Sequence, residues 1–174
     1  RMKWMVNEAV KRYLSYRMRR IERYMNDPAP FQERWFRQLL ETARATQFGR
    51  DHDFGNIRTH DDFTRNVPVF DYERIKPYIT RMMHGERDVL WPGEVNWYSK
   101  SSGTTSDKSK FIPVPPTNLF GNHIAGSWDS LALLYANKPN LEIFRRRNLL
   151  LPGSFEALKA YPRTRFGDVS AVLT

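Results

Sequence analysis

A run of small hydroxylated residues at positions 99–110 has the side-chain types that bind phosphate. Consecutive small residues allow successive backbone N–H groups to turn toward one anion, and each Ser or Thr hydroxyl adds a donor. Gly103 gives the backbone the freedom that a close approach to phosphate requires, and a Lys supplies compact positive charge. We therefore predict that nucleotide phosphates bind to Ser101, Ser102, Gly103, Thr104, Thr105 and Lys110, with Lys100 and Lys108 as further candidate cations.

This loop differs from the Walker phosphate loop. Its Gly, Lys and Ser/Thr residues have a different spacing, and a strand-like segment follows where a Walker loop would lead into a helix. Binding would therefore depend on backbone amides and hydroxyls. Because the composition alone favours a solvated Ser/Thr linker, the interpretation as a binding loop depends on the surrounding sequence.

Short apolar segments on both sides of the loop predict the strands that would hold it in place. Residues 95–98 and 111–114 form the two strands, and Pro113 assigns the second to a sheet edge or a bulge. Upstream, residues 67–70 predict another strand, followed by Asp71 as a helix cap. The helix itself is predicted at residues 77–84, with Pro77 in its first turn and Gly85 at its end.

Amphipathic stripes predict three longer helices. The first covers residues 2–25, and the second runs from residue 31 until Phe48 and Gly49 end it. The third covers residues 117–137, and its predicted buried side consists of Leu119, Phe120, Ile124, Trp128, Leu131, Leu134 and Tyr135.

The remaining segments complete an α/β fold, with a mixed sheet flanked by helices. Residues 51–66 are polar and irregular, residues 148–151 suit a strand covered on both faces, and residues 167–174 predict one more strand. We expect residues 1–50 to form a helical hairpin that packs on the main domain. Residues 51–174 would form an incomplete α/β domain, because the sequence stops within an apolar strand.

Composition restricts the kinds of site and the setting. The sequence has no Cys, which excludes disulfides, thiolate metal sites and Cys nucleophiles. It has no apolar run of transmembrane length, and its N-terminus is rich in Arg rather than signal-like, so a reducing, cytoplasmic setting fits. The net charge is +9, of which residues 1–50 carry +7, with 12 Lys or Arg against 5 Asp or Glu.

This concentration of charge leaves two alternative functions without catalysis. The first predicted helix could attract nucleic acid nonspecifically through Lys11, Arg12, Arg17, Arg19, Arg20 and Arg23, although no sequence-reading module accompanies it. The same helix could lie on a membrane surface, although its apolar stripe is also what packing in a helix hairpin needs.

Other residues form weaker candidates. The four histidines, His52, His60, His84 and His123, have no ligand spacing, so we predict no metal site from protein ligands. Asp61 and Asp62 suit the start of a helical turn after Thr59 better than a metal site. Residues 145–147 are three Arg that could bind phosphate, but a solvated strand entry is favoured. No catalytic residue is assigned.

Several blocks together resemble a known family. Residues 98–105 and 110–114 resemble the first nucleotide motif of the acyl-adenylate-forming superfamily, the relatives of firefly luciferase. Residues 67–79 and 167–173 are closer to its auxin-responsive acyl acid amido synthetase family, which also has two opening helices. Ser106 and Ser109 depart from the superfamily, which usually has Gly at the first position and often Pro at the second.

The resemblance implies a ligase that uses ATP and Mg²⁺. Such an enzyme activates a carboxylic acid as an acyl-adenylate and conjugates it to an amine or amino acid, with the loop on the β- and γ-phosphates. Residues of the third helix could line an acyl pocket, as that region does in relatives. The family's adenine-binding motif, ribose-binding Asp and C-terminal Lys lie beyond position 174. We therefore expect an inactive fragment from the N-terminal part of the large adenylate-forming domain.

Overall fold

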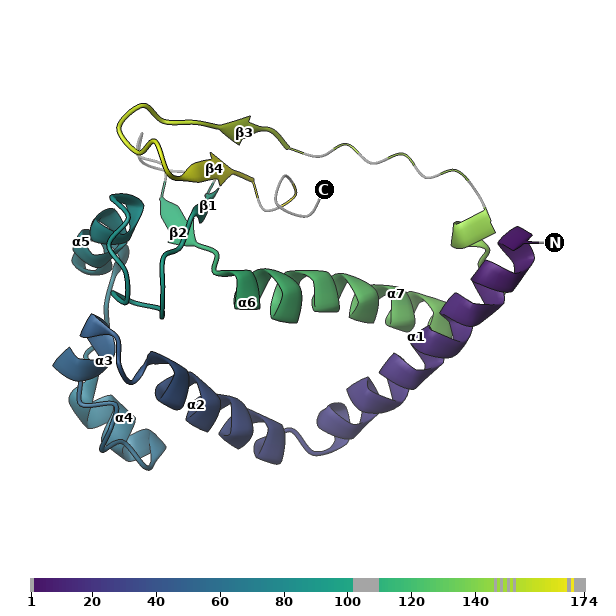
Figure 1. The fold of residues 1–174 in the computed structure, drawn as a ribbon. Helices are drawn as coiled ribbons and strands as arrows, with labels where there is room; N and C mark the ends of the chain where they lie inside the picture. The colour runs from purple at the N-terminus through teal and green to yellow at the C-terminus, as the bar shows by residue number, and fades with distance from the viewer. Residues whose placement is uncertain are drawn as a thin grey trace. The chain divides into compact units, whose positions relative to one another are not determined.

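The computed structural model describes residues 2–101, 110–145, 147, 149, 151, 153–168 and 170. The chain divides into two compact units, coloured along the sequence in Figure 1. Unit 1 consists of Arg1–Gln32 and Thr117–Leu151, and unit 2 consists of Glu33–Pro116 and Pro152–Thr174.

Unit 1 is built on two long helices. Helix α1 (Met2–Asn26) packs against helix α7 (Ala125–Asn137). Leu14 and Ile21 from α1 meet Ala132 and Tyr135 from α7 in a shared core, and none of these four side chains is more than 6% exposed. The predicted first helix is thereby confirmed. Leu14 and Ile21 of its apolar stripe pack against α7, whereas Val6, Tyr13 and Met25 of the same stripe are exposed.

The predicted third helix is a continuous helical segment of three parts. A short turn α6 (Pro116–Asn118) and a π-helix (Leu119–Ile124) precede α7. The wider turns of the π-helix shift the faces by about one residue, so a stripe drawn at 3.6 residues per turn goes out of register. Phe120 is 65% exposed as a result. The prediction that Phe120 and Leu134 are buried is therefore wrong, since Leu134 flanks the core-facing positions of α7.

Unit 2 contains a four-stranded mixed sheet with strand order β2-β1-β4-β3. Strand β1 (Trp97–Lys100) pairs antiparallel with β2 (Phe111–Pro113) and parallel with β4 (Arg165–Gly167), and β3 (Phe155–Glu156) pairs antiparallel with β4. The predicted α/β class with a mixed sheet is confirmed, and β2 is an edge strand, as Pro113 indicates.

The core of unit 2 lies between this sheet and helix α5 (Tyr72–Met83). Tyr98 from β1 and Phe166 from β4 are fully buried, and α5 contributes Ile79 and Met82. The helix is capped by Asp71 as predicted, because its carboxylate accepts a hydrogen bond from the Arg74 amide at 2.8 Å.

Two predictions around α5 are wrong. The helix begins at Tyr72 and contains Pro77, because the cap at Asp71 starts it before the proline is reached. Residues 67–70 form no strand; Val69 is 91% exposed, and no strand in the described part of the chain pairs with this segment. The predicted end of α5 is confirmed, since Gly85 follows it with a φ of +88°.

The helices between α1 and α5 differ from those predicted. Helix α2 (Ala29–Ala43) ends before Phe48, because Thr46 begins a new helix, α3 (Gln47–Asp51), by accepting a hydrogen bond from the Gly49 amide. Helix α4 (His60–Asn66) lies in the segment predicted to be irregular. It begins with a capping box between Thr59 and Asp62, which confirms the predicted helical turn.

The predicted strands at the C-terminal end also need correction. Leu149 and Leu151 are 84% and 85% exposed and belong to no strand, while positions 148 and 150 lie outside the described residues. Strand β4 ends at Gly167, the residue at which the predicted strand begins, and its Phe166 side chain lies in the core. After Gly167, Asp168 belongs to no strand and Ser170 is helical, while the other positions of the predicted strand lie outside the described residues.

Candidate phosphate-loop site

The β1–β2 hairpin fixes the two ends of the candidate phosphate loop. Lys100 lies opposite Phe111 in the ladder, and the next residue, Ser101, donates its amide to the Lys110 carbonyl at 2.9 Å. At the end of the hairpin away from the loop, the Val114 amide donates to the Trp97 carbonyl at 2.8 Å. Strand β1 extends two residues further toward the loop than predicted. The backbone bond between Ser101 and Lys110 then joins the two ends of the loop.

Of the six predicted phosphate-binding residues, the structure places two. Ser101 is partly exposed and Lys110 is exposed, and the backbone bond above brings them together. Ser102, Gly103, Thr104 and Thr105 lie outside the described residues, so the roles of all six stay predictions.

Tyr72 holds the first residue of β2, which the sequence does not reveal. Its hydroxyl accepts a hydrogen bond from the Phe111 amide at 2.8 Å and lies 3.3 Å from the Phe111 carbonyl. Lys110 and Val114 make backbone hydrogen bonds to the neighbouring strand. The amide and carbonyl of Phe111 therefore lie on the outer side of the edge strand, where they need another partner. The position directly after the Asp71 cap is the only sequence signal for this contact.

Tyr72 also organises charge at the base of the loop. The Lys110 ammonium lies 5.6 Å from the centroid of the Tyr72 ring, within the range of a cation–π interaction. Within the described residues, Lys110 forms no ion pair, whereas Lys100 pairs with Glu156 at 3.2 Å across the sheet. Lys110 is therefore the better placed of these two lysines to meet an anion.

The loop stands on a rigid part of the core. The Tyr98 and Phe166 rings are 5.6 Å apart, and Phe111 meets Phe166 edge-on at 4.9 Å. Burial, with a smaller contribution from the Glu94 carboxylate, raises the pKa of the Tyr98 phenol above its usual range. Tyr98 therefore remains neutral and supports the strand rather than exchanging protons.

A shallow cavity of about 360 Å³ lies beside the hairpin in unit 2. Its apolar floor includes Ile79, Met83 and Phe111, and Lys76 and Lys100 stand among its polar side chains. Lys76 pairs with Glu73 at 3.3 Å, so both cations at this cavity already have carboxylate partners.

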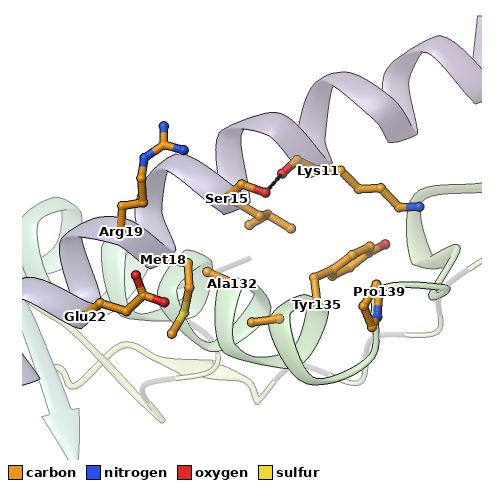
Figure 2. Close-up of a pocket in the computed structure, with 10 residues that line it drawn as sticks. Lys11, Ser15, Met18, Arg19, Glu22, Ala132, Tyr135 and Pro139 are labelled. Carbon is orange, nitrogen blue, oxygen red and sulfur yellow. Dashed lines mark hydrogen bonds between the residues drawn. The ribbon is translucent and has the colours of Figure 1, made fainter.

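A second cavity, of about 330 Å³, lies between α1 and α7 in unit 1 (Figure 2). Leu14, Met18 and Ala132 give it an apolar floor. Tyr135 lines it as well, but its hydroxyl is already engaged by the Ile143 amide at 3.1 Å.

The other candidate residues have structural roles. His60 stacks on Phe36 at 4.1 Å, and the Nδ1 atom of His52 lies 3.0 Å from the Asn66 carbonyl. Asp62 caps α4. Among the residues that the structure describes, no group of three or more His, Cys, Asp or Glu side chains could hold a metal ion, and no helix is long and apolar enough to cross a membrane.

The GH3 family N-terminal domain matches residues 17–146, a range that contains the hairpin and its loop. The chain belongs to the GH3 family. A solved structure of the same family, the GH3.15 acyl acid amido synthetase, has the same fold, with a TM-score of 0.76 and 22% identity. This similarity covers 94% of the present chain and 28% of the GH3.15 chain.

GH3 relatives in plants share parts of this sequence. The jasmonoyl–L-amino acid synthetase GH3.5 of Oryza sativa subsp. japonica is 29% identical over 93 residues, which are 53% of this chain and 16% of the relative. The 4-substituted benzoates–glutamate ligase GH3.12 of Arabidopsis thaliana is 40% identical over 52 residues, or 29% of this chain and 9% of the relative. The matched part thus spans less than a fifth of these relatives.

Proposed function

We propose that this chain carries the ATP phosphate loop of an acyl acid amido synthetase, an enzyme that joins a carboxylic acid to an amine or amino acid. The observation that carries the proposal is the pinned hairpin. Its two strands end in the bond between Ser101 and Lys110, with Lys110 beside Tyr72, inside the region that matches the GH3 domain. A loop fixed at both ends loses less entropy when it closes on a ligand.

The proposed reaction has two steps. A carboxylate oxygen attacks the α-phosphorus of ATP, the bond to the bridging oxygen breaks, and pyrophosphate leaves with that electron pair. The amine nitrogen then attacks the acyl carbon, AMP departs, and the nitrogen loses a proton. Charge that develops on the leaving pyrophosphate would be stabilised by the loop amides, the hydroxyls of Thr104 and Thr105, and Lys110.

ATP would bring Mg²⁺ with it, since magnesium in such sites is held largely by phosphate oxygens and water. Magnesium supplies additional neutralisation of the triphosphate charge. The part assigned to this chain is to bind and orient the β- and γ-phosphates through the loop.

The substrates are small molecules: a carboxylic acid, and an amine or amino acid. The two relatives named above act on different acids, by their names jasmonate-type and benzoate-type, so the acid is left open here. We further propose a cytoplasmic location, a helical segment over residues 1–50 and an adenylating α/β segment over residues 51–174. Catalysis would require more of a GH3 protein than these 174 residues.

The test is acid-dependent exchange of pyrophosphate into ATP, measured on a longer GH3 protein that contains this segment. Thr104→Val should raise the Michaelis constant for ATP, because it replaces a phosphate-binding hydroxyl by a methyl group of the same shape. Thr117→Val is the matched control outside the loop. An unchanged Michaelis constant in Thr104→Val would contradict the loop assignment, and exchange by the 174-residue chain alone would contradict the proposal that catalysis requires more of the protein.

A further inference from the structure

Helix α1 has two opposite faces with different chemistry. Leu14 and Ile21 are each 1% exposed and pack in the core that α1 shares with α7. Arg12 and Arg19 occupy the positions two residues earlier, which is about 200° around the helix. Figure 2 shows the Arg19 side chain directed away from α7. One face of α1 is therefore used in packing, and the other is exposed, with Arg19 also lining the cavity between α1 and α7.

The exposed face carries uncompensated positive charge. Arg12, Arg19, Arg20 and Arg23 are all exposed, and within the described part of the chain none of them pairs with a carboxylate. They cover about 16 Å of helix length. Arg17 shows the contrast, since its guanidinium binds the Asp129 carboxylate at 2.7 Å and is used inside unit 1.

Large apolar and aromatic side chains accompany these arginines. Trp4 is 57% exposed, Met5 is 63% exposed, and Tyr16 is 56% exposed. Exposed apolar groups next to cations are unfavourable in water and mark surfaces that meet another phase or molecule. Trp and Tyr are enriched where a bilayer meets water, and Arg can place its apolar stem in lipid while its head binds phosphate.

We propose that this face of α1, formed by Met5, Arg12, Tyr16, Arg19, Arg20 and Arg23 with Trp4 at its end, docks the protein onto an anionic lipid surface. The charge complementarity is with the phosphate headgroups, and the apolar side chains enter the interface. A second copy of the same face is disfavoured because four arginines would oppose four. Duplex nucleic acid would satisfy the arginines but would gain little from Trp4 and Met5, because its bases are stacked inside the helix.

From the sequence, a membrane role is disfavoured, because the apolar stripe of the first helix would be buried by packing in a helix hairpin. In the structure, this packing leaves other large side chains of α1 exposed. Packing against α7 uses the face that contains Leu14 and Ile21, and it leaves Trp4, Met5 and Tyr16 exposed.

The experiment is co-sedimentation of the 174-residue chain with vesicles of phosphatidylcholine alone or mixed with phosphatidylglycerol. We expect binding only to the mixed vesicles, weakened by salt. Replacing the four arginines by Gln should reduce that binding at least about tenfold, since each cation near an anionic surface contributes separately. Gln keeps helix propensity, and circular dichroism would verify that α1 is intact.

The matched control removes the same charge from unit 2 by replacing four exposed cations with Gln: Arg44, Arg58, Arg87 and Lys159. This control should sediment like the unaltered chain. Equal losses in both variants would reduce the effect to net charge and overturn the proposal.

A single substitution separates lipid from nucleic acid. Trp4→Ser should weaken binding to the mixed vesicles several-fold and leave binding to a double-stranded oligonucleotide unchanged, because paired bases are not available to stack on Trp4. No vesicle binding together with salt-sensitive oligonucleotide binding would overturn the lipid proposal. The four-arginine variant should still bind ATP, so this inference can fail while the proposed function stands.

Discussion

The hairpin that carries the proposed phosphate loop and the outer face of α1 are the two regions that we propose bind anions, and they are built in opposite ways. The hairpin has its strand ends hydrogen-bonded between Ser101 and Lys110 and rests on the buried rings of Tyr98 and Phe166. The face of α1 has four exposed arginines on a single helix, of which Arg19 also lines the cavity between α1 and α7. In our proposal, the loop would offer directed donors with little charge, and the face of α1 would offer charge with little direction.

With the hairpin as the proposed nucleotide site, net charge is a poor guide to where nucleotide binds. Residues 1–50 carry +7 of the +9 net charge, yet the hairpin lies outside them. Charge on a flexible exposed side chain attracts any anion and is screened by salt, whereas amides fixed by a sheet select geometry. Substitutions that affect one region and spare the other would make this contrast sharper, and substitutions that affect both would break it.

The largest effect is expected from Phe166→Ala. Phe166 is fully buried and contacts both Tyr98 and Phe111, so its loss should cost about 3–5 kcal/mol of unfolding free energy. Urea unfolding would measure this cost, and ATP binding should weaken while vesicle binding through α1 persists. If Phe166→Ala does not fold, Phe166→Leu provides a milder form, and equal loss of both binding activities would break the contrast.

A smaller effect is expected where α1 is attached to α7. Arg17→Ala removes hydrogen bonds to the Asp129 carboxylate and the Ala125 carbonyl, at 2.7 and 2.9 Å, and should cost about 1.5–3 kcal/mol. The matched control is Arg12→Ala on the exposed face of the same helix, which should change stability by less than about 0.5 kcal/mol. Similar unfolding midpoints for the two variants would show that Arg17 does not hold unit 1 together.

The contact between Tyr72 and β2 comes next. Tyr72→Phe leaves the Phe111 amide without its partner and should cost about 1–2 kcal/mol while weakening ATP binding a few-fold. Tyr161→Phe is the control, because Tyr161 lines the same cavity and its hydroxyl forms no hydrogen bond within the described residues. An ATP affinity that is unchanged in Tyr72→Phe would show that the hydrogen bond from Phe111 to Tyr72 does not contribute to ATP binding by the loop.

The smallest effect is a pH dependence at the cap of α4. Hydrogen bonds from the Arg58 amide and from Thr59 lower the pKa of the exposed Asp62 carboxyl below its ordinary value of 3.8. Asp62 therefore stabilises the fold above that value, and the contribution disappears as the pH falls through the lowered pKa. Asp62→Asn should reduce the urea midpoint at neutral pH and match the unaltered chain in strong acid. A difference that does not depend on pH would contradict this account.

The sequence predicts the parts of the fold that follow local chemistry. The stripe of α1, the cap at Asp71, the turn at Thr59 and the edge position of Pro113 are set by near neighbours along the chain. The family resemblance also follows from contiguous blocks, and the match to the GH3 domain confirms it.

The sequence does not predict features that depend on distant partners. The π-helix before α7 changes which residues are buried, and no local pattern announces it. Residues 67–70 have strand-like composition but find no neighbouring strand. The bond from Tyr72 to Phe111 joins residues 39 positions apart, and it exists only because α5 lies beside the sheet edge. Long-range pairing, rather than propensity, decides each case.

The most direct test of the central claim is calorimetric titration of ATP with Mg²⁺ into the 174-residue chain and two variants. One variant carries Thr104→Val in the loop, and the other has Arg12, Arg19, Arg20 and Arg23 replaced by Gln. The account predicts that the unaltered chain and the arginine variant bind with similar affinity, while the loop variant binds at least several-fold more weakly. Binding lost in the arginine variant and kept in the loop variant would contradict it.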